Sequence, residues 1–588
     1  MKLAEPVSEN IRKRATAIGT LCVFLFVALL AFTAMADEGL TTEGPKVGTG
    51  MGLTLLLAAL AGMVVLGMPL FVIIGVLAIM CFVFLGADFK GIETLDLLPD
   101  KAAEMMGKNV LLAIPFFVVS GSIMSAGGIA QRLVDFARAL VGWMPGGLAV
   151  AAVFSCVIFA AISGSSPVTV IAIGSMMYPQ LVKAGYDRRF TLGLVTAGGS
   201  LGILIPPSIP MLVYAIVASS AQPIDVAELF LAGVVPGLMI GAIMAARSLF
   251  EGKNVEREKF EFRIVVQRFR DGIWALGLPV LILGGIYTGM FTPTEAAAVS
   301  VIYALVVELL IHRNITAQEL PKILTEAVVN MGTILIIMAL AFGLNAFLVE
   351  EMIPQQVVVW ILARDLTPVT FLLIVNLFLL LVGALMDSIS AILIIAPLIA
   401  PIGAELGIDP VHLGIIFIVN LEIGYLTPPI GINLFVASSV FRQPIGEVIR
   451  GVVPFIGLML LGLVAVTYVP TISLGPVNTI MREQPFYSPF PDAPEAPTIL
   501  IDDPNSDEDV VGDMGKPPAE PVVGPGGKRV KSVAEMMAES ENETEGDEDE
   551  DEDEEDTEAE PKPAFDGSGM NMVPKDPDAE DDEDEMDP

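Results

Sequence analysis

The sequence predicts an all-α polytopic membrane protein made of two inverted repeats, each containing a re-entrant helical hairpin and a broken transmembrane helix. The chain is 54% hydrophobic, and apolar runs of about 20 residues, enough for a helix to cross a bilayer, recur between residues 15 and 470. Motifs recur at a constant offset of 222 residues, which carries Asp187 to Asp409 and Pro206-Pro207 to Pro428-Pro429. Each copy contains an odd number of predicted crossings, and the alternation of basic and acidic loops independently indicates that the copies are inverted.

The order of the segments predicts the domain organisation. Residues 1–36 contain a basic stretch, an apolar run and the sequence Ala34-Met35-Ala36, which fits either a cleavable signal peptide or an extra N-terminal span. The first membrane repeat is predicted at 51–250 and the second, inverted repeat at 272–470. Residues 251–271 between them form a basic linker that the positive-inside rule assigns to the cytoplasm.

The charge of the chain is concentrated at its C-terminal end. Residues 501–588 contain 34 acidic and 6 basic residues, a net charge of −28 out of −36 for the whole chain. A segment this charged and this poor in apolar residues cannot bury a core. We therefore predict a disordered, acidic, periplasmic tail over residues 483–588.

One apolar segment in each repeat is interrupted at its centre and has both ends on the same side of the membrane, which predicts a hairpin. The first, 148–182, is interrupted at Ser163–Pro167, and the second, 369–402, at residues 383–390. The segment after each hairpin is broken by glycines and a Pro-Pro pair, at Gly198–Ser208 and at Glu422–Asn433. Such interrupted segments at matching positions of two repeats are typical of a transporter's binding site.

The four interruptions indicate the chemistry of that site. Unpaired backbone groups cannot face lipid, so the interruptions are expected to line an enclosed cavity, each hairpin tip paired with the break of its own repeat. A single interruption could equally be a helix kink, but four at matched positions argue against that. Carbonyls at helix ends suit a small cation and helix N-termini suit an anion, which favours Na⁺ and a carboxylate substrate over a transition metal. Predicted substrate-binding residues are Ser165, Pro206, Ser208, Asp387, Ser388 and Asn433.

Two acidic residues lie at hydrophobic depth, where ionisable groups are functional candidates. Asp387 is either such a group or the N-cap of the second hairpin arm. Glu422 is either functional or a residue near the membrane edge. The chain contains three cysteines and two histidines, which leaves little for metal or acid–base chemistry, so an enzyme is not expected.

These motifs carry a family resemblance. ISGSSPVTVIAIGSMMYPQL followed by AGGSLGILIPPS, repeated as MDSISAILIIAPLIAPI and GYLTPPIGINL, resembles the large permease subunit of the tripartite ATP-independent periplasmic (TRAP) transporters over residues 51–470. The resemblance implies an elevator-type secondary transporter of the ion-transporter superfamily in the bacterial inner membrane. It implies uptake of an organic acid, such as a dicarboxylate, a sialic acid or another carboxylate, driven by a Na⁺ gradient. No cofactor besides the coupling Na⁺, and no nucleic acid, is expected.

The resemblance also implies partners and ion ligands. The partners are a separate small four-helix membrane subunit and a periplasmic solute-binding protein. The implied ligands of one Na⁺ are Ser163 and Ser166 with the backbone of Gly202, Ile205 and Pro207, and those of the other are Gly383, Gly424, Thr427 and Ile430. Two alternatives remain at this point: a stand-alone Na⁺/dicarboxylate symporter of the divalent-anion type, which would work without a binding protein, and a membrane-embedded enzyme or scaffold.

Overall fold

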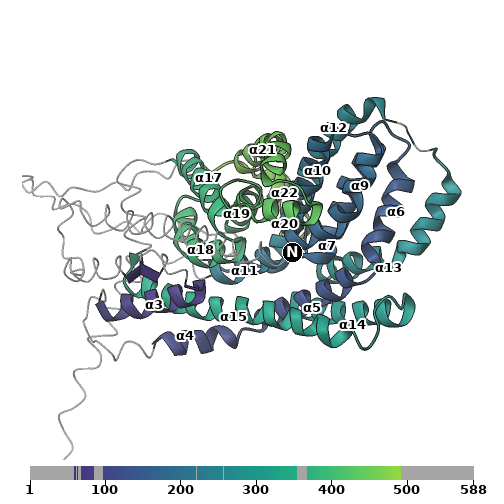
Figure 1. The fold of residues 1–588 in the computed structure, drawn as a ribbon. Coiled ribbons are helices and arrows are strands. Elements are labelled where there is room, and N and C mark those ends of the chain that lie inside the picture. The colour runs from purple at the N-terminus through teal and green to yellow at the C-terminus, as the bar shows by residue number, and fades with distance from the viewer. Residues whose placement is uncertain are drawn as a thin grey trace, which may run out of the picture. The chain divides into compact units, whose positions relative to one another are not determined.

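The computed structural model describes residues 59–60, 62–63, 68–84, 97–219, 222–255, 257, 259–353 and 367–491, and regular secondary structure in these residues is helical throughout (Figure 1). The all-α prediction is confirmed. The elements are α3 (Leu70–Phe84), α4 (Leu97–Met106), η2 (Asn109–Leu112), α5 (Ala113–Ala126), α6 (Ile129–Val141), α7 (Gly147–Ser163), α8 (Ser166–Thr169), η3 (Val170–Gly174), α9 (Ser175–Lys183), α10 (Arg188–Ser200), η4 (Leu201–Ile203), α11 (Ile209–Ala218), α12 (Val226–Glu251), η5 (Gly252–Asn254), α13 (Phe262–Tyr287), α14 (Pro293–Leu305), η6 (Val306–Ile311), α15 (Leu320–Glu350), α17 (Pro368–Leu385), α18 (Ser388–Glu405), α19 (Pro410–Gly424), α20 (Ile432–Phe441), α21 (Ile445–Tyr468) and α22 (Thr471–Ile480).

The repeat found in the sequence is present in the helices. An offset of 222 residues brings α7, α10, α11 and α12 onto α17, α19, α20 and α21, with ends that agree within a few residues. The equivalent helices α10 and α19 also begin in the same way. The side chain of Asp187 accepts hydrogen bonds from two backbone N–H groups of α10, and that of Asp409 does so for α19. An N-cap of this kind stabilises a helix by about 1 kcal/mol.

The first interrupted segment is a hairpin. Helix α7 ends at Ser163, and Gly164 reverses the chain with φ of +57°, a conformation that glycine adopts without a steric penalty. Helix resumes at Ser166 and continues through the π-helical η3 into α9. The two outer ends lie together, since a Cβ placed on Gly252 would lie 2.2 Å from Gly146 Cα, just before α7, and 2.9 Å from Tyr186 Oη, just after α9. The second hairpin is interrupted at Met386 and Asp387, between α17 and α18.

The two predicted broken helices are broken where expected. In the first repeat, α10 passes into η4, residues 204–208 are not helical, and α11 follows. In the second repeat, α19 ends at Gly424 and α20 begins at Ile432. The bonds Pro206–Pro207 and Pro428–Pro429 are both cis.

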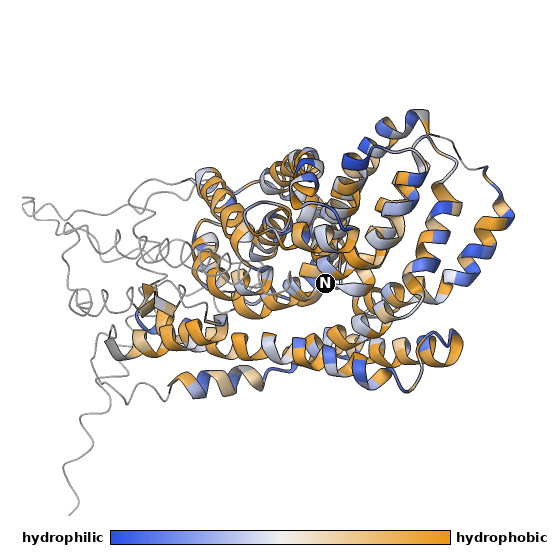
Figure 2. Cartoon of the chain, in the orientation of Figure 1, coloured by the Kyte–Doolittle hydropathy of each residue, from blue (hydrophilic) through white to orange (hydrophobic). Residues whose placement is uncertain are grey.

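Eight of the described helical segments are long and apolar enough to cross a membrane. The 31-residue α15 packs along α3, α4 and α5, and α13 packs against α6 and α14. Large apolar side chains are exposed on several of these helices, and Leu377 of α17 is 65% exposed. Figure 2 shows that hydrophobic residues predominate along α15 and α17. Outward apolar side chains are stable against lipid, so the chain is a multi-pass membrane protein.

Two predicted boundaries differ from the structure. Residues 262–271, assigned to the basic linker, form the first turns of α13. Residues 483–491, assigned to the disordered tail, pack on α22: the ring of Phe486 lies against Gly475, and Thr471 and Ser488 exchange two hydrogen bonds of 3.0 and 3.1 Å. That part of the tail prediction is wrong, because hydrogen bonds and ring contacts, including that of Phe490 with Tyr468, hold this short stretch against the helices. Residues 1–36 and 492–588 lie outside the described residues.

Candidate functional site

The first hairpin tip lies directly against the break of its own repeat. A Cβ placed on Gly202 would lie 2.5 Å from the carbonyl oxygen of Ser165, and one on Gly164 would lie 2.9 Å from the carbonyl oxygen of Pro207. Both distances are shorter than real Cβ contacts allow, so backbone meets backbone here. The predicted residues Ser165, Gly202 and Pro207 are therefore brought together.

Hydroxyl groups line this first tip. Ser163 Oγ lies 2.9 Å from Thr169 Oγ1, and both hydroxyls lie within hydrogen-bonding distance of the carbonyl oxygen of Ser165, at 3.3 and 2.9 Å. Ser163 was predicted as a ligand and Thr169 was missed. Thr169 follows Ser165 by one helical turn, and that spacing is the signal in the sequence that could have identified it.

The second tip and break make the equivalent contact. A Cβ placed on Gly424 would lie 2.5 Å from the Cα and carbonyl carbon of Gly383. The N–H of Ile430 donates to the carbonyl of Ala384 at 3.1 Å. The predicted residues Gly383, Gly424 and Ile430 therefore meet across the tip–break contact. Thr427 belongs to the same break, and its hydroxyl donates to the carbonyl of Ile423 one turn earlier.

A tyrosine fixes the second tip in place. The Oη of Tyr425 accepts the backbone N–H of Ser388 at 2.9 Å and lies 2.7 Å from Ser388 Oγ. Tyr425 was not predicted, because an aromatic residue within an apolar run reads as core. Asp387 is the N-cap of α18, where its side chain accepts from the N–H and the hydroxyl of Ser390 at 3.0 and 2.6 Å.

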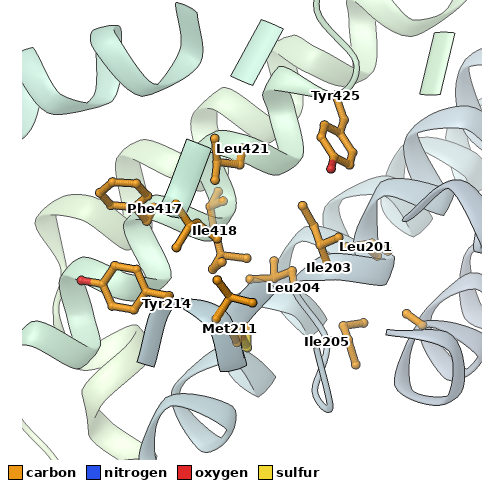
Figure 3. Packing of buried hydrophobic residues seen from close by; sticks show 14 of the residues in the cluster. Leu201, Ile203, Leu204, Ile205, Met211, Tyr214, Phe417, Ile418, Leu421 and Tyr425 are labelled. Carbon is orange, nitrogen blue, oxygen red and sulfur yellow. The ribbon is translucent and has the colours of Figure 1, made fainter. Parts of the chain in front are cut away.

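Within this region, two side-chain hydrogen bonds join the tips and breaks of different repeats. Asn433 Nδ2, from α20, donates to Ser166 Oγ at 2.6 Å, which links the first tip to the second break. Ser200 Oγ donates to Glu422 Oε1 at 3.0 Å, which links the two breaks. Glu422 is fully buried, and this contact places its carboxylate between the two breaks. All four interruptions thus form one cluster, and Figure 3 shows Leu201 and Ile203 of the first break beside Leu421 and Tyr425 of the second repeat.

The remaining predicted residues lie in the same cluster with their side chains turned elsewhere. Ile205 packs against Gly237 of α12, so only its backbone can face the tip. The hydroxyl of Ser208 donates to the carbonyl of Ile203. The equivalent prolines differ, since Pro206 and Pro207 are buried whereas Pro428 and Pro429 are exposed. The Pro-Pro pair of the second break therefore lies at the surface of the protein in this structure, and that of the first break does not.

The cluster combines helix ends and hydroxyl oxygens with two separate carboxylates, those of Asp387 and Glu422. Helices α7, α10, α17 and α19 end there and α11, α18 and α20 begin there, which places carbonyl groups and N–H groups in the same small region. No group of three His, Cys, Asp or Glu residues that could hold a metal occurs among the described residues. Carbonyl and hydroxyl oxygens suit a hard cation of low charge, and helix N-termini suit an anionic group.

Comparisons with known proteins identify the family and support the fold. The family model described as "Tripartite ATP-independent periplasmic transporter, DctM component" matches residues 57–472. A solved structure of the YdaH transporter of Alcanivorax borkumensis matches 68% of this chain and 91% of its own, with a TM-score of 0.50 and 16% identity, which supports the fold alone.

Curated relatives cover most of the membrane part. The C4-dicarboxylate TRAP transporter large permease protein DctM of Pseudomonas aeruginosa is 46% identical over 64% of this chain and 88% of its own length. The protein of the same name in Vibrio cholerae is 41% identical over 72% of this chain and 97% of its own length. The ectoine/5-hydroxyectoine TRAP transporter large permease protein UehC of Ruegeria pomeroyi is 35% identical over 70% and 95%. The chain therefore belongs to the DctM family, and it is the large permease of a TRAP transporter rather than an enzyme.

Proposed function

We propose that this permease uses a Na⁺ gradient to take up an organic acid that a periplasmic solute-binding protein delivers, together with a small membrane subunit in the bacterial inner membrane. The observation that carries the proposal is the pair of tip–break contacts, where helix ends bring carbonyl oxygens close together. Na⁺ is a cation that several neutral oxygens can hold. Relatives named for C4-dicarboxylate support a dicarboxylate as the first substrate to test.

Each tip–break contact is proposed to hold one Na⁺. Ser163 and Ser166 with the backbone of Gly202, Ile205 and Pro207 would supply the first set of oxygens, and Gly383, Gly424, Thr427 and Ile430 the second. Asn433 supports this assignment, because its Oδ1 is buried without a hydrogen-bond partner among the described residues. That oxygen lies on the side chain that already reaches Ser166.

The substrate is proposed to bind at the helix N-termini of the same cluster. Ser165 and Ser388 precede or begin helices there, and Asn433 lies in the first turn of α20. The N–H groups of such turns and their partial positive charge favour a carboxylate. The Asp387 carboxylate would repel an anion, so its proposed role is to fix the N-terminus of α18 and not to bind the carboxylate itself.

The experiment compares hydroxyl-removing variants of the two contacts. Thr427→Val keeps the shape of the side chain and removes its oxygen, whereas Thr427→Ser keeps the oxygen. Loss of one ligand should raise the Na⁺ concentration for half-maximal dicarboxylate uptake by about tenfold, equivalent to about 1.4 kcal/mol. Ser166→Ala should act in the same direction.

Two controls separate ligand loss from general damage. Ser219→Ala removes a hydroxyl at the end of α11, outside the break, where it donates to the carbonyl of Ala215. This variant, like Thr427→Ser, should keep the Na⁺ dependence of the wild type. If Thr427→Val and Ser166→Ala both show wild-type Na⁺ dependence, the two hydroxyls only pack and the ion assignment is wrong.

A further inference from the structure

A polar pocket lies away from the tip–break cluster, between α6, α13 and the residue that follows η6. Its volume is about 410 Å³, within the size range of small-molecule sites. The lining residues are Arg132 and Asp135 of α6, Arg268, Arg270, Asp271 and Trp274 of α13, and His312. Tyr303 of α14 donates to the carbonyl of Trp274 at 2.7 Å, which fixes α14 beside this part of α13.

The pocket presents hydrogen-bond donors that the described part of the chain does not use. Arg132 Nη1 and His312 Nε2 are buried and have no hydrogen-bond partner there. Burial and the positive charge of Arg132 lower the pKa of His312, so its ring is neutral near pH 7 and can donate one hydrogen bond. Buried donors without partners are costly, so a ligand with acceptor oxygens would be stabilised here.

The charges around the pocket divide into paired and available groups. Arg268 Nη1 lies 3.4 Å from Asp135 Oδ2 and 3.9 Å from Asp271 Oδ2, so this arginine compensates both aspartates. Arg132 and Arg270 form no salt bridge among the described residues. The buried carboxylate of Glu308 lies near Arg132 and offsets part of its charge. Its Oε2 accepts from Asn314 at 2.9 Å, and its Oε1 has no hydrogen-bond partner among the described residues. Arg132 Nη1 nevertheless remains without a hydrogen bond there, and Arg270 without a carboxylate partner, so both guanidinium groups can donate to an anion, and their planar geometry matches a phosphate.

Apolar side chains flank the pocket on both helices. Phe269 and Ile273 of α13 are 42% and 44% exposed, and Trp274, which lines the pocket, is 42% exposed. Leu310, two residues before His312, is 67% exposed. Tryptophan beside basic residues is typical of a membrane interface, and the loop charges assign this end of α13 to the cytoplasmic side. A ligand with both an anionic head and apolar chains fits these surroundings better than free phosphate does.

We propose that the pocket binds the phosphate headgroup of an anionic phospholipid from the cytoplasmic leaflet, with Arg132, Arg270 and His312 as the headgroup ligands. Basic pockets between transmembrane helices on this side of a membrane are suited to anionic headgroups. The acyl chains would lie along the exposed apolar faces of α13 and η6. A bound lipid would also hold α6 and α13 together, since both line the pocket, and α14 packs beside them.

The experiment uses Trp274 as the reporter. The chain contains three tryptophans, and Trp143→Phe with Trp360→Phe leaves Trp274 alone in the full-length protein. The protein is placed in phosphatidylcholine bilayers with a minor fraction of phosphatidylglycerol, and brominated acyl chains are carried either by the phosphatidylglycerol or by an equal amount of phosphatidylcholine. Bromine quenches tryptophan fluorescence on contact. We expect stronger quenching by brominated phosphatidylglycerol.

Variants and a soluble competitor test the assignment. Arg132→Gln and Arg270→Gln should each reduce the preference for phosphatidylglycerol about fivefold, the effect of about 1 kcal/mol for one basic residue near a membrane surface. Arg270 is exposed, so its replacement tests the pocket without disturbing the core. Arg263→Gln is the matched control, because Arg263 is an exposed residue of the same helix outside the pocket lining.

Three results would overturn the proposal. Equal quenching by the two brominated lipids would show that the pocket does not select an anionic headgroup. A preference that survives both arginine substitutions would place the selecting contacts elsewhere. Removal of the quenching by inorganic phosphate alone would assign the pocket to free phosphate and not to a lipid.

Discussion

The contact between Gly383 and Gly424 allows a sharp test of the second tip–break pair. In Gly424→Ala, the new Cβ would lie 2.5 Å from the Cα and carbonyl carbon of Gly383, whereas ordinary contacts begin at 3.4 Å. The nearest atoms are backbone on both sides, so no side chain can rotate away. The tip and the break must therefore separate by about 1 Å. Overpacking of this kind costs about 1–3 kcal/mol, and a displacement of 1 Å at a site can lower its activity about 100-fold.

The assay does not require the substrate. The melting temperature of the purified protein is measured in NaCl and in KCl at equal ionic strength. A site that binds Na⁺ only in the folded state stabilises it by about 1.4 kcal/mol at ten times the dissociation constant, and by about 0.4 kcal/mol if binding weakens tenfold. Gly424→Ala should therefore lose most of the Na⁺-specific stabilisation of this site.

The matched control is Gly457→Ala in α21. A Cβ on Gly457 would meet no atom within 4 Å, and alanine in a helix interior is favoured over glycine by about 0.5–1 kcal/mol. This variant should keep the full Na⁺ response and melt at the same temperature or slightly higher. A Gly424→Ala protein that responds to Na⁺ as the wild type does would refute the reasoning.

The other predictions concern the ends of the chain and its orientation. Arg482 forms salt bridges with Glu228 of α12 at 2.5 Å and with Asp409, the residue before α19, at 2.6 Å. Arg482→Gln should therefore lower the free energy of unfolding, measured in a thermal melt, by about 1–2 kcal/mol. Arg450→Gln, which breaks a pair whose arginine side chain is 67% exposed, should change it by less than about 0.5 kcal/mol. Deleting 492–588 should leave the melting temperature unchanged, and a deletion that also includes Arg482 should lower it. In intact spheroplasts, an impermeant thiol reagent should label Asp513→Cys but not Lys259→Cys; the reverse pattern would contradict the predicted topology.

The sequence predicts the interruptions well because glycine and proline act locally. A Pro-Pro pair cannot continue a helix, and Gly164 allows the positive φ of the first tip, so the breaks follow from a few adjacent residues. The partners of those breaks depend on packing between distant segments. The bond between Asn433 and Ser166 spans 267 residues, and no periodicity within either helix indicates it.

Residues that combine apolar and polar character were harder to assign. Tyr425 lies within an apolar run, and only the structure shows that its hydroxyl reaches Ser388. The stretch 483–491 has the composition of a flexible linker, but Phe486 and the ring of Phe490, 6.0 Å from that of Tyr468, are enough to dock it. A few aromatic contacts are not visible in average composition, so the tail was predicted to begin too early.

The hydrogen bond between Ser200 and Glu422 has a geometric property that the other contacts lack. The two residues are 222 positions apart, so the two-fold operation that exchanges the repeats sends each one to the place of the other. Two residues that are in contact and that the rotation exchanges must lie on either side of the rotation axis, close to it. The bond between Ser166 and Asn433 has no such property, because its image would join Ser388 to Met211, which has no polar hydrogen to donate. If transport exchanges the conformations of the two repeats, the contact at the axis keeps its partners while the contacts away from it change theirs. Ser200 and Glu422 then mark the fixed point about which the rest of the site is rearranged.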